Sequence, residues 1–216
     1  TKSGEPVQFG NSPDIWPGGE ETYSSYGVPW ANLSNTPFRL YKGWVHEGGI
    51  ATPFIAHWPD GMNVASGSLH RSPWQLPDVM ASVCEIAGGV YPTEHQGRSI
   101  RPLEGHSFAA VFSNLDIERG APLFWEHEGN SAMRAGRWKL VREFSRNPEL
   151  PMENPAAWEL YDMVEDRTEL EDLSARLPEL VRSMLKTYLE WAVRCNVMDF
   201  AKLKEYHRRM SNSTGA

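Results

Sequence analysis

The second half of the chain carries the pattern that most restricts its fold. Short segments with strand character, separated by turn residues, cover residues 122–128, 132–134, 138–142 and 158–162. Ala135-Gly136 lies between the two middle segments and is typical of a tight hairpin turn. This succession of short strands and tight turns indicates an antiparallel sheet.

A strongly amphipathic helix is predicted to start at Pro178, since proline suits the first helical position. Its apolar residues gather on one side of the helix: Leu180, Val181, Met184, Leu185, Tyr188, Trp191 and Ala192. A helix of this kind buries that side against a sheet. We therefore expect a small α+β unit, with a four-stranded antiparallel sheet and this helix across one face. Another helix is expected at residues 199–210.

The first half of the chain has a different character. Residues 1–37 are rich in Gly, Pro, Ser and Asn without a lasting period, which predicts a long loop. Residues 53–58, Pro-Phe-Ile-Ala-His-Trp, are expected to form a buried strand before a turn. A helix is expected to run from Pro77 to Gly88-Gly89. Its apolar stripe consists of Met80, Val83, Cys84 and Ala87. Strand followed by helix indicates part of an α/β layer.

Composition narrows the class of partner. The 216 residues are enough to bury a core, and the net charge of -7 is spread along the chain without a basic stripe. This argues against nucleic acid or an anionic membrane as a partner and favours a small-molecule or protein ligand. No apolar run approaches the roughly 20 residues of a membrane span. The first residues lack a secretory signal, so either the protein is cytoplasmic or its true start lies upstream.

Lys42 is the first candidate for a binding residue, because it lies four residues before His46-Glu47-Gly48-Gly49. A lysine ammonium can bind an anion as a point charge, and glycines let the backbone approach a ligand closely. A solvated lysine beside a glycine turn explains the same residues more simply. The pattern alone favours that simpler interpretation.

A second polar cluster consists of Glu126, His127, Glu128, Gly129 and Asn130. On a strand, Glu126 and Glu128 face one way and His127 the other, so the three cannot serve one site. We interpret the segment as an edge strand with solvated carboxylates, in which His127 is the candidate for lining a pocket. No metal-ligand spacing, nucleophile elbow, P-loop or dinucleotide fingerprint occurs, so no metal site is predicted in this chain.

Several segments together resemble the sulfatase family of the alkaline-phosphatase-like superfamily. Residues 41–59, YKGWVHEGGIATPFIAHWP, resemble the family's lysine and Glu-Gly-Gly segment, and residues 25–42, SYGVPWANLSNTPFRLYK, resemble the approach to it in bacterial arylsulfatases. Residues 76–88 resemble a family helix, although Met80-Ala81-Ser82 stands where Met-Pro-Thr is common. Residues 122–141 and 158–181 resemble the family's C-terminal subdomain in order and spacing.

The resemblance implies a two-part α/β architecture. Residues 1–118 would be the C-terminal end of the catalytic mixed-sheet domain, including the lysine segment. Residues 119–216 would form a small α+β subdomain, in which a helix packs on a four-stranded antiparallel sheet. This agrees with the fold expected from the patterns themselves.

The resemblance also implies hydrolysis of a sulfate ester. In the family, a formylglycine made from Cys or Ser reacts with the ester while a calcium ion polarises the sulfate. Lys42 matches the family lysine that contacts the sulfate oxygens, and it is the expected catalytic residue of this chain. Residues 26–37 would shape the substrate pocket with Trp30 as an apolar wall. His46 and His127 are further candidates for lining it.

This sequence departs from the family pattern in its reactive half. The motif Cys/Ser-x-Pro/Ala-x-Arg does not follow Cys84 or Cys195 and occurs nowhere else in the chain. The paired aspartates of the metal site and the upstream Asp-Asn-Gly are absent as well. Calcium and formylglycine are therefore expected to belong to an N-terminal part missing here, and this chain alone is expected to be inactive.

Two alternative functions stay open beside the sulfatase. A phosphate or phosphonate ester hydrolase of the same superfamily would use a lysine in the same way, and a stand-alone anion-binding module would need no nucleophile. For the sulfatase, the expected partners are a small-molecule or carbohydrate sulfate ester and the missing N-terminal part. The family implies a periplasmic or secreted location in a bacterium.

Overall fold

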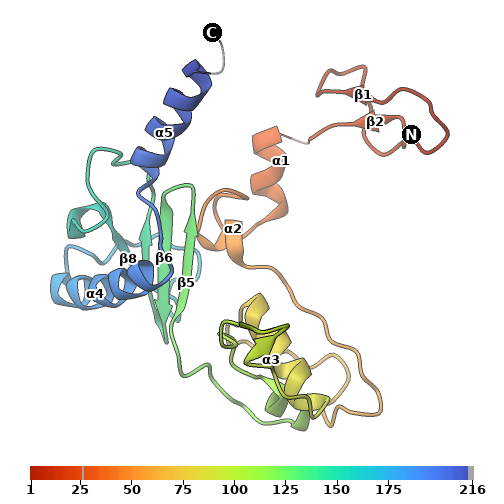
Figure 1. Ribbon diagram of the computed structural model, residues 1–216, viewed down its shortest axis with the longest axis vertical. Coiled ribbons are helices and arrows are strands. Elements are labelled where there is room, and N and C mark those ends of the chain that lie inside the picture. The colour runs from red at the N-terminus through yellow and green to blue at the C-terminus, as the bar shows by residue number, and fades with distance from the viewer. Residues whose placement is uncertain (26, 214–216) are drawn as a thin grey trace. The chain divides into compact units, whose positions relative to one another are not determined.

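The computed structural model describes residues 1–25 and 27–213 (Figure 1). The chain divides into two compact units. The first unit comprises residues 1–51, 125–132 and 137–216, and the second comprises residues 52–124 and 133–136. The functional division into residues 1–118 and 119–216 stays a prediction.

A four-stranded antiparallel sheet organises the C-terminal half, in the order β5-β6-β7-β8. Its strands are β5 (Leu123–His127), β6 (Asn130–Ala135), β7 (Trp138–Arg142) and β8 (Glu159–Asp162). The hairpin between β6 and β7 turns at Gly136, whose φ of 55° suits a residue without a Cβ. The predicted fold class, with its sheet and packed helix, is confirmed, and the predicted strands differ only at their ends.

Helix α4 (Pro178–Arg194) lies across one face of this sheet (Figure 1). Tyr188 is fully buried there, and its ring packs against that of Trp158 with centroids 4.9 Å apart. The buried residues of the helix are Val181, Met184, Leu185, Tyr188 and Ala192, all from the predicted apolar stripe, whereas Leu180 and Trp191 of that stripe are half-buried. Burial of each large side chain contributes roughly 2 kcal/mol, so this face depends on apolar packing.

The opposite face of the sheet combines apolar and charged residues. Lys139 lies opposite Tyr161, and Val141 lies opposite Glu159, so all four side chains share one face by strand alternation. Val45, just after the Lys42 segment, packs there in a buried cluster with Ala132, Val141, Tyr161 and Met163. The sheet thus supports the segment in which the sequence predicts the binding lysine.

A buried ion triad fixes this contact. Lys139 is fully buried within β7, and its Nζ lies 2.8 Å from Glu47 Oε1 and 2.8 Å from Glu169 Oε1. The other oxygen of Glu169 accepts a hydrogen bond from the Glu47 backbone N–H at 2.7 Å. A buried lysine is stable only when carboxylates and hydrogen bonds replace its water. The triad therefore ties short helix α2 (Glu47–Ile50) to the sheet.

The remaining C-terminal helix is α5 (Phe200–Ser213), which confirms the prediction of a last helix. The ring of Phe200 packs edge to face on that of Phe144, with centroids 5.2 Å apart. No helix in the described part of the chain has the length and apolar character needed to cross a membrane.

The prediction of a long loop over residues 1–37 is wrong in part. Strands β1 (Gln8–Phe9) and β2 (Thr22–Tyr23) pair in parallel, and helix α1 (Gly27–Ser34) follows. Gly27 and Pro29 signal a loop in the sequence, but they lie in the first turn of the helix, where a proline is tolerated. The helix buries no residue, so it has no apolar stripe for a periodic pattern to reveal. Tyr26, at the start of the predicted pocket loop, lies outside the described residues.

The second unit contains helix α3 (Leu76–Ile86), the hairpin strands β3 (Glu94–His95) and β4 (Arg98–Ser99), and the 3-10 helix η1 (Ala109–Ser113). Asp78 in the first turn of α3 is fully buried. Its carboxylate accepts the backbone N–H groups of Gln75 and His106 at 2.7 Å each and pairs with the Arg119 guanidinium at 3.1 and 3.2 Å. This network decides which side of α3 faces inward.

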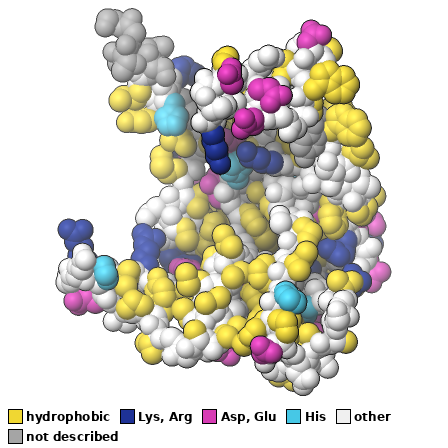
Figure 2. All heavy atoms as spheres, turned by 90° about the vertical axis from the view of Figure 1, so that its right-hand side faces the viewer, with side chains coloured by type: hydrophobic (Ala, Val, Ile, Leu, Met, Phe, Trp, Pro, Cys, Tyr) yellow, Lys and Arg dark blue, Asp and Glu magenta, His cyan; other side chains and the backbone are white. Residues whose placement is uncertain are grey.

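Two predictions for the second unit are corrected by the structure. Residues 53–58 form no strand, and Ile55 is 88% exposed, because no described strand pairs with this segment. Helix α3 forms and ends before Gly88 as predicted, but its apolar stripe is not in a core, since Met80 and Val83 are each 53% exposed. Figure 2 shows hydrophobic side chains spread over the surface on one face of the molecule.

Replacing the buried ammonium tests the ion triad. Lys139→Met keeps the length of the side chain but leaves two buried carboxylates without their cation. We expect the free energy of unfolding, measured by urea denaturation, to fall by about 4 kcal/mol. The control is Lys186→Met on the exposed side of α4, where a change within about 0.5 kcal/mol is expected. Equal losses in the two variants would show that the triad contributes nothing.

Candidate functional site

The predicted binding residue, Lys42, lies in a tight turn. The Trp44 N–H donates to the Tyr41 carbonyl at 3.2 Å, and the two rings pack edge to face with centroids 4.6 Å apart. Gly43 has a φ of 109°, which residues with a Cβ rarely adopt. The Lys42 side chain is exposed, and within the described part of the chain its ammonium forms no hydrogen bond or ion pair. The turn therefore presents a cation to solvent.

The two glycines of the motif pack against the backbone of this turn. A Cβ at Gly48 would overlap the carbonyl oxygens of Arg39 and Leu40, and a Cβ at Gly49 would overlap that of Trp44. From the sequence, we expected the glycines to allow a left-handed conformation or the close approach of a ligand. In the structure, they allow the approach of the chain's own residues 39–44.

Before the turn, Asn32 of helix α1 and Asn35, which follows the helix, hold the backbone of Leu40. The Leu40 N–H donates to Asn32 Oδ1 at 3.2 Å, and the Leu40 carbonyl accepts from Asn35 Nδ2 at 3.0 Å. Leu40 itself has a φ of 67°, a conformation that costs a branched residue free energy unless its surroundings fix it. Two amide side chains supply that support.

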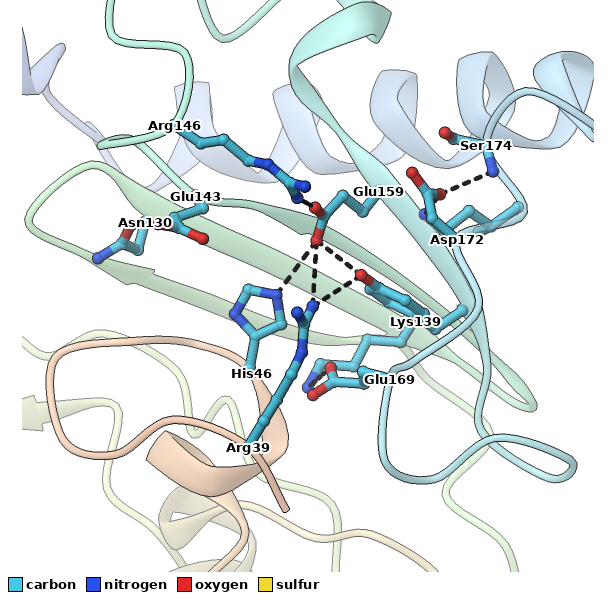
Figure 3. A network of polar contacts seen from close by, with 12 residues as sticks. Arg39, His46, Asn130, Lys139, Glu143, Arg146, Glu159, Glu169, Asp172 and Ser174 are labelled. Carbon is cyan, nitrogen blue, oxygen red and sulfur yellow. Dashed lines mark hydrogen bonds and ion pairs between the residues drawn. The ribbon is translucent and has the colours of Figure 1, made fainter. Parts of the chain in front are cut away.

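After the turn, His46 is fully buried and points at Glu159 of β8 (Figure 3). His46 Nε2 lies 3.2 Å from Glu159 Oε2, which also accepts from the Tyr161 hydroxyl at 2.7 Å and from Arg39 Nη2 at 3.4 Å. Arg146 forms an ion pair with the other oxygen of Glu159. One carboxylate thus holds residues on both sides of the Lys42 turn.

Burial controls the protonation of this cluster. It lowers the pKa of His46 from 6.5 to about 4, with Glu169 and Glu143 acting to raise that pKa and Arg39 and Lys139 to lower it. His46 is therefore neutral at pH 7, and it donates from Nε2 to the Glu159 carboxylate, while its Nδ1 is buried and has no hydrogen-bond partner among the described residues. A neutral imidazole in this position acts as a structural hydrogen-bond donor.

The same burial keeps the Tyr161 phenol protonated. It raises the pKa of Tyr161 to about 12, while Arg39 acts to lower that pKa. The hydroxyl can therefore donate to Glu159 and accept from Arg39 Nη2, which lies 2.8 Å away. The phenol links the guanidinium to the carboxylate.

Asn130 contacts the turn directly. Its Nδ2 donates to the carbonyl of Gly43, the residue after Lys42, at 2.8 Å. Its Oδ1 accepts from the Phe144 N–H at 3.0 Å. The side chain lies at the start of β6, in the polar cluster that the sequence singles out, and it connects that cluster to the lysine segment.

The structure places the four predicted site residues in different surroundings. Lys42 is exposed on its turn, whereas His46 is enclosed behind it. Trp30 lies on α1 and is 62% exposed, and His127 is exposed at the end of edge strand β5. Their roles as substrate-binding residues stay predictions.

The residues that hold the turn were not predicted from the sequence. They are Arg39, Asn130, Lys139, Glu159, Tyr161 and Glu169. The sequence does hint at two of them, because Lys139 and Glu159 are charged but fall on the same side of their strands as apolar neighbours, which indicates buried charges. Partners 80 residues or more away in the sequence cannot be found from local patterns, as in the Lys139–Glu47 pair, whose separation is 92.

The metal implied by the family resemblance finds no ligands in the described part of the chain. No group of three or more His, Cys, Asp or Glu residues lies there in a position to hold an ion. The buried carboxylates of Glu47, Glu159 and Glu169 are already paired with lysine, arginine or histidine. The described residues therefore do not provide the set of free oxygen ligands that a calcium ion needs.

Acid is expected to weaken the fold through His46. Its pKa is 6.5 when unfolded and about 4 when folded, so between these values the unfolded chain binds more protons and stability falls with falling pH. From pH 7 to pH 5, we expect His46 to account for about 2 kcal/mol of lost unfolding free energy. Urea titrations at both pH values should show a smaller loss in His46→Gln, whereas His127→Gln, at an exposed position, should keep the wild-type loss.

The packing of the glycines predicts a steric effect. Gly48→Ala and Gly49→Ala should each lower the unfolding free energy by about 3 kcal/mol, because the new methyl group meets backbone that cannot move aside easily. Gly120→Ala is the matched control, since its Cβ would meet nothing within 4 Å and its backbone is not left-handed. If thermal melts show all three variants to be alike, the glycines are not packing residues.

Comparison with known proteins finds similarity to sulfatases. No protein-family model matches the sequence. The chain is 26% identical over 199 residues to an uncharacterized sulfatase of Schizosaccharomyces pombe, covering 84% of this chain and 32% of that protein. It is 25% identical over 185 residues to a sulfatase of Formosa agariphila, covering 81% and 32%. An arylsulfatase of Klebsiella aerogenes is 34% identical over 106 residues, covering 48% and 22%.

A solved structure has a similar fold. The crystal structure of Ps i-CgsB matches with a TM-score of 0.57 and 22% identity, over 74% of this chain and 34% of that one. The chain spans about a third of the length of this protein and of the yeast and Formosa relatives. The resemblance predicted from the quoted segments is confirmed: the chain is similar to sulfatases over most of its own length and over about a third of theirs.

Proposed function

We propose that the chain is the C-terminal part of a sulfatase, a hydrolase of sulfate esters, and that Lys42 contacts the sulfate group. The observation that carries this proposal is the geometry of the turn. Lys42 is exposed, while Val45, His46 and Glu47 just beyond it are buried and held by the sheet. The match to sulfatases over most of the chain supports the same assignment.

The chemistry suits a lysine in this position. Hydrolysis of a sulfate ester builds negative charge on the oxygens of the transferring group and on the leaving oxygen. An ammonium group offers three donors to such oxygens, and it stabilises the transition state best when its support is fixed before the reaction. The contacts of Leu40, Gly43, His46 and Glu47 supply that support.

The reactive half of the site would come from elsewhere. We infer that the formylglycine nucleophile and the calcium ion belong to an N-terminal part of the same enzyme, since the residues described here offer neither. The substrate class is a small-molecule or carbohydrate sulfate ester. The proposed location, periplasmic or secreted, rests on the family alone.

An autonomous anion-binding module fits the surface less well. Phe54, Ile55, Met80 and Val83 expose large apolar side chains in the second unit, which an independent domain would bury. A phosphate or phosphonate ester hydrolase remains the second candidate, because a lysine contacts either tetrahedral anion. The nucleophile discriminates between the two: a formylglycine motif upstream favours sulfate, and an upstream Ser or Thr nucleophile favours phosphate.

Removing the ammonium group tests the assignment of Lys42. The open reading frame that includes this chain would be expressed and assayed with 4-nitrophenyl sulfate and 4-nitrophenyl phosphate. We expect Lys42→Ala to lower kcat for the sulfate ester by about 10²- to 10³-fold with an unchanged melting temperature, because one charged donor to the transition state is lost. Lys186→Ala, an exposed lysine of α4, is the control.

Three results would contradict the proposal. If Lys42→Ala turns over the sulfate ester as fast as the wild type, Lys42 is not the sulfate contact. If the wild type hydrolyses only the phosphate ester, the second candidate is correct. A reading frame without any nucleophile motif would favour the binding module.

A further inference from the structure

The position of Lys42 depends on its backbone, because its own side chain has no partner in the described part of the chain. Leu40 is held two residues before it by Asn32 and Asn35. The next firmly held side chains begin at Val45, three residues after it. Between these points, the rings of Tyr41 and Trp44 pack on each other within the turn, and the side-chain hydrogen bond that reaches the turn from the sheet runs from Asn130 Nδ2 to the Gly43 carbonyl, at 2.8 Å.

Gly43 is the point at which this turn is easiest to deform. Its φ of 109° lies in a region open to glycine, and glycine has more accessible backbone conformations than any other residue. Rotation at Gly43 would change the direction of Lys42 relative to Val45, which packs on the sheet. A hydrogen bond to the Gly43 carbonyl opposes that rotation.

The orientation of the Asn130 amide is determined by its partners. The Phe144 N–H can only donate, so it faces Oδ1, and the Gly43 carbonyl can only accept, so it faces Nδ2. Asn130 directly follows Glu128 and Gly129, whose φ values of 52° and 85° form the turn into β6. Its position is thus set by the sheet, and its amide cannot flip without losing both bonds.

We propose that Asn130 is a positioning residue for Lys42, which holds the lysine turn in the geometry needed to contact a sulfate group. The effect on sulfate turnover rests on the proposed function, whereas the hydrogen bond from Asn130 to Gly43 does not. It also gives a role to the polar cluster at residues 126–130, in which neither His127 nor the two exposed glutamates reaches the lysine segment by a contact that the structure shows.

The sharpest variant is Asn130→Asp. The carboxylate keeps an acceptor for the Phe144 N–H but has no donor for the Gly43 carbonyl, so the two oxygens repel each other. The matched control is Asn154→Asp, which adds the same charge where the side chain only accepts a hydrogen bond, from the Ala156 N–H at 3.0 Å. Asn130→Ala removes both bonds without a charge and serves if the aspartate variant does not fold.

The first measurement needs no activity. Amide hydrogen exchange of the protein expressed from the full reading frame would be followed at the Trp44 N–H, which bonds to the Tyr41 carbonyl within the turn. We expect exchange at this amide to become about fivefold faster or more in Asn130→Asp, with wild-type exchange in Asn154→Asp, because one hydrogen bond restraining the turn is lost. Unchanged exchange at Trp44 would overturn the proposal.

The second measurement is a double-mutant cycle on turnover of 4-nitrophenyl sulfate by the full reading frame. Asn130→Asp should lower kcat about tenfold or more in the wild-type background and leave the residual rate of Lys42→Ala unchanged, since it acts through the lysine. Equal losses in both backgrounds would mean a merely structural role and overturn the inference. If the wild type has no sulfatase activity, the proposed function fails, while the exchange result still decides whether Asn130 holds the turn.

Discussion

A fully buried lysine within strand β7 is the constraint on which the first unit depends. Lys139 cannot lose its water unless carboxylates reach it, and both Glu47 and Glu169 come from distant segments to do so. Because Glu47 and Glu169 both bind Lys139, the Lys42 segment and the loop after β8 pack on the same face of the sheet. The apolar residues around Val45 can then pack, because the charged contact fixes where the segment lies.

The two faces of the sheet are therefore stabilised by different forces. Helix α4 covers one face with apolar side chains, in a contact that tolerates exchanges of similar volume. The other face depends on paired charges and on the single acceptor Glu159 Oε2, where geometry and protonation state both matter. Such a polar network permits few alternative arrangements, and this would suit the role proposed for Lys42.

Much of the fold could be predicted from the sequence because it depends on local signals. The helix after Pro178 and the hairpin at Gly136 follow from periodicity and turn chemistry. The predictions failed where the structure of a segment depends on which other segment it packs or pairs with. Residues 53–58 have the composition of a buried strand, but a strand forms only when a neighbour supplies its hydrogen bonds, and Met80 lies on an exposed stripe because Asp78 faces Arg119 instead. Helix α1 was missed because all of its residues face solvent to some degree.

In the candidate site, too, local sequence signals reveal less than the contacts between distant residues. Lys42 could be found only from its resemblance to a family segment, since a lysine before two glycines has a simpler explanation. The residues that hold it, Glu159 and Asn130, are separated from it by more than 80 positions, and the pairing of β7 with β8 places Glu159. No local pattern encodes such contacts, because they arise from the tertiary arrangement.

The close packing of Gly48 and Gly49 against residues 39–44 also affects the entropy of anion binding. The backbone of the turn has already lost its conformational freedom during folding, whereas the exposed Lys42 side chain keeps its rotamers. An anion would therefore have to order only the four-carbon stem of one lysine, at a cost of about 2 kcal/mol, and not a loop of several residues. The two glycines would thus lower the entropic cost of the anion binding proposed for Lys42, although neither of them need touch the ligand.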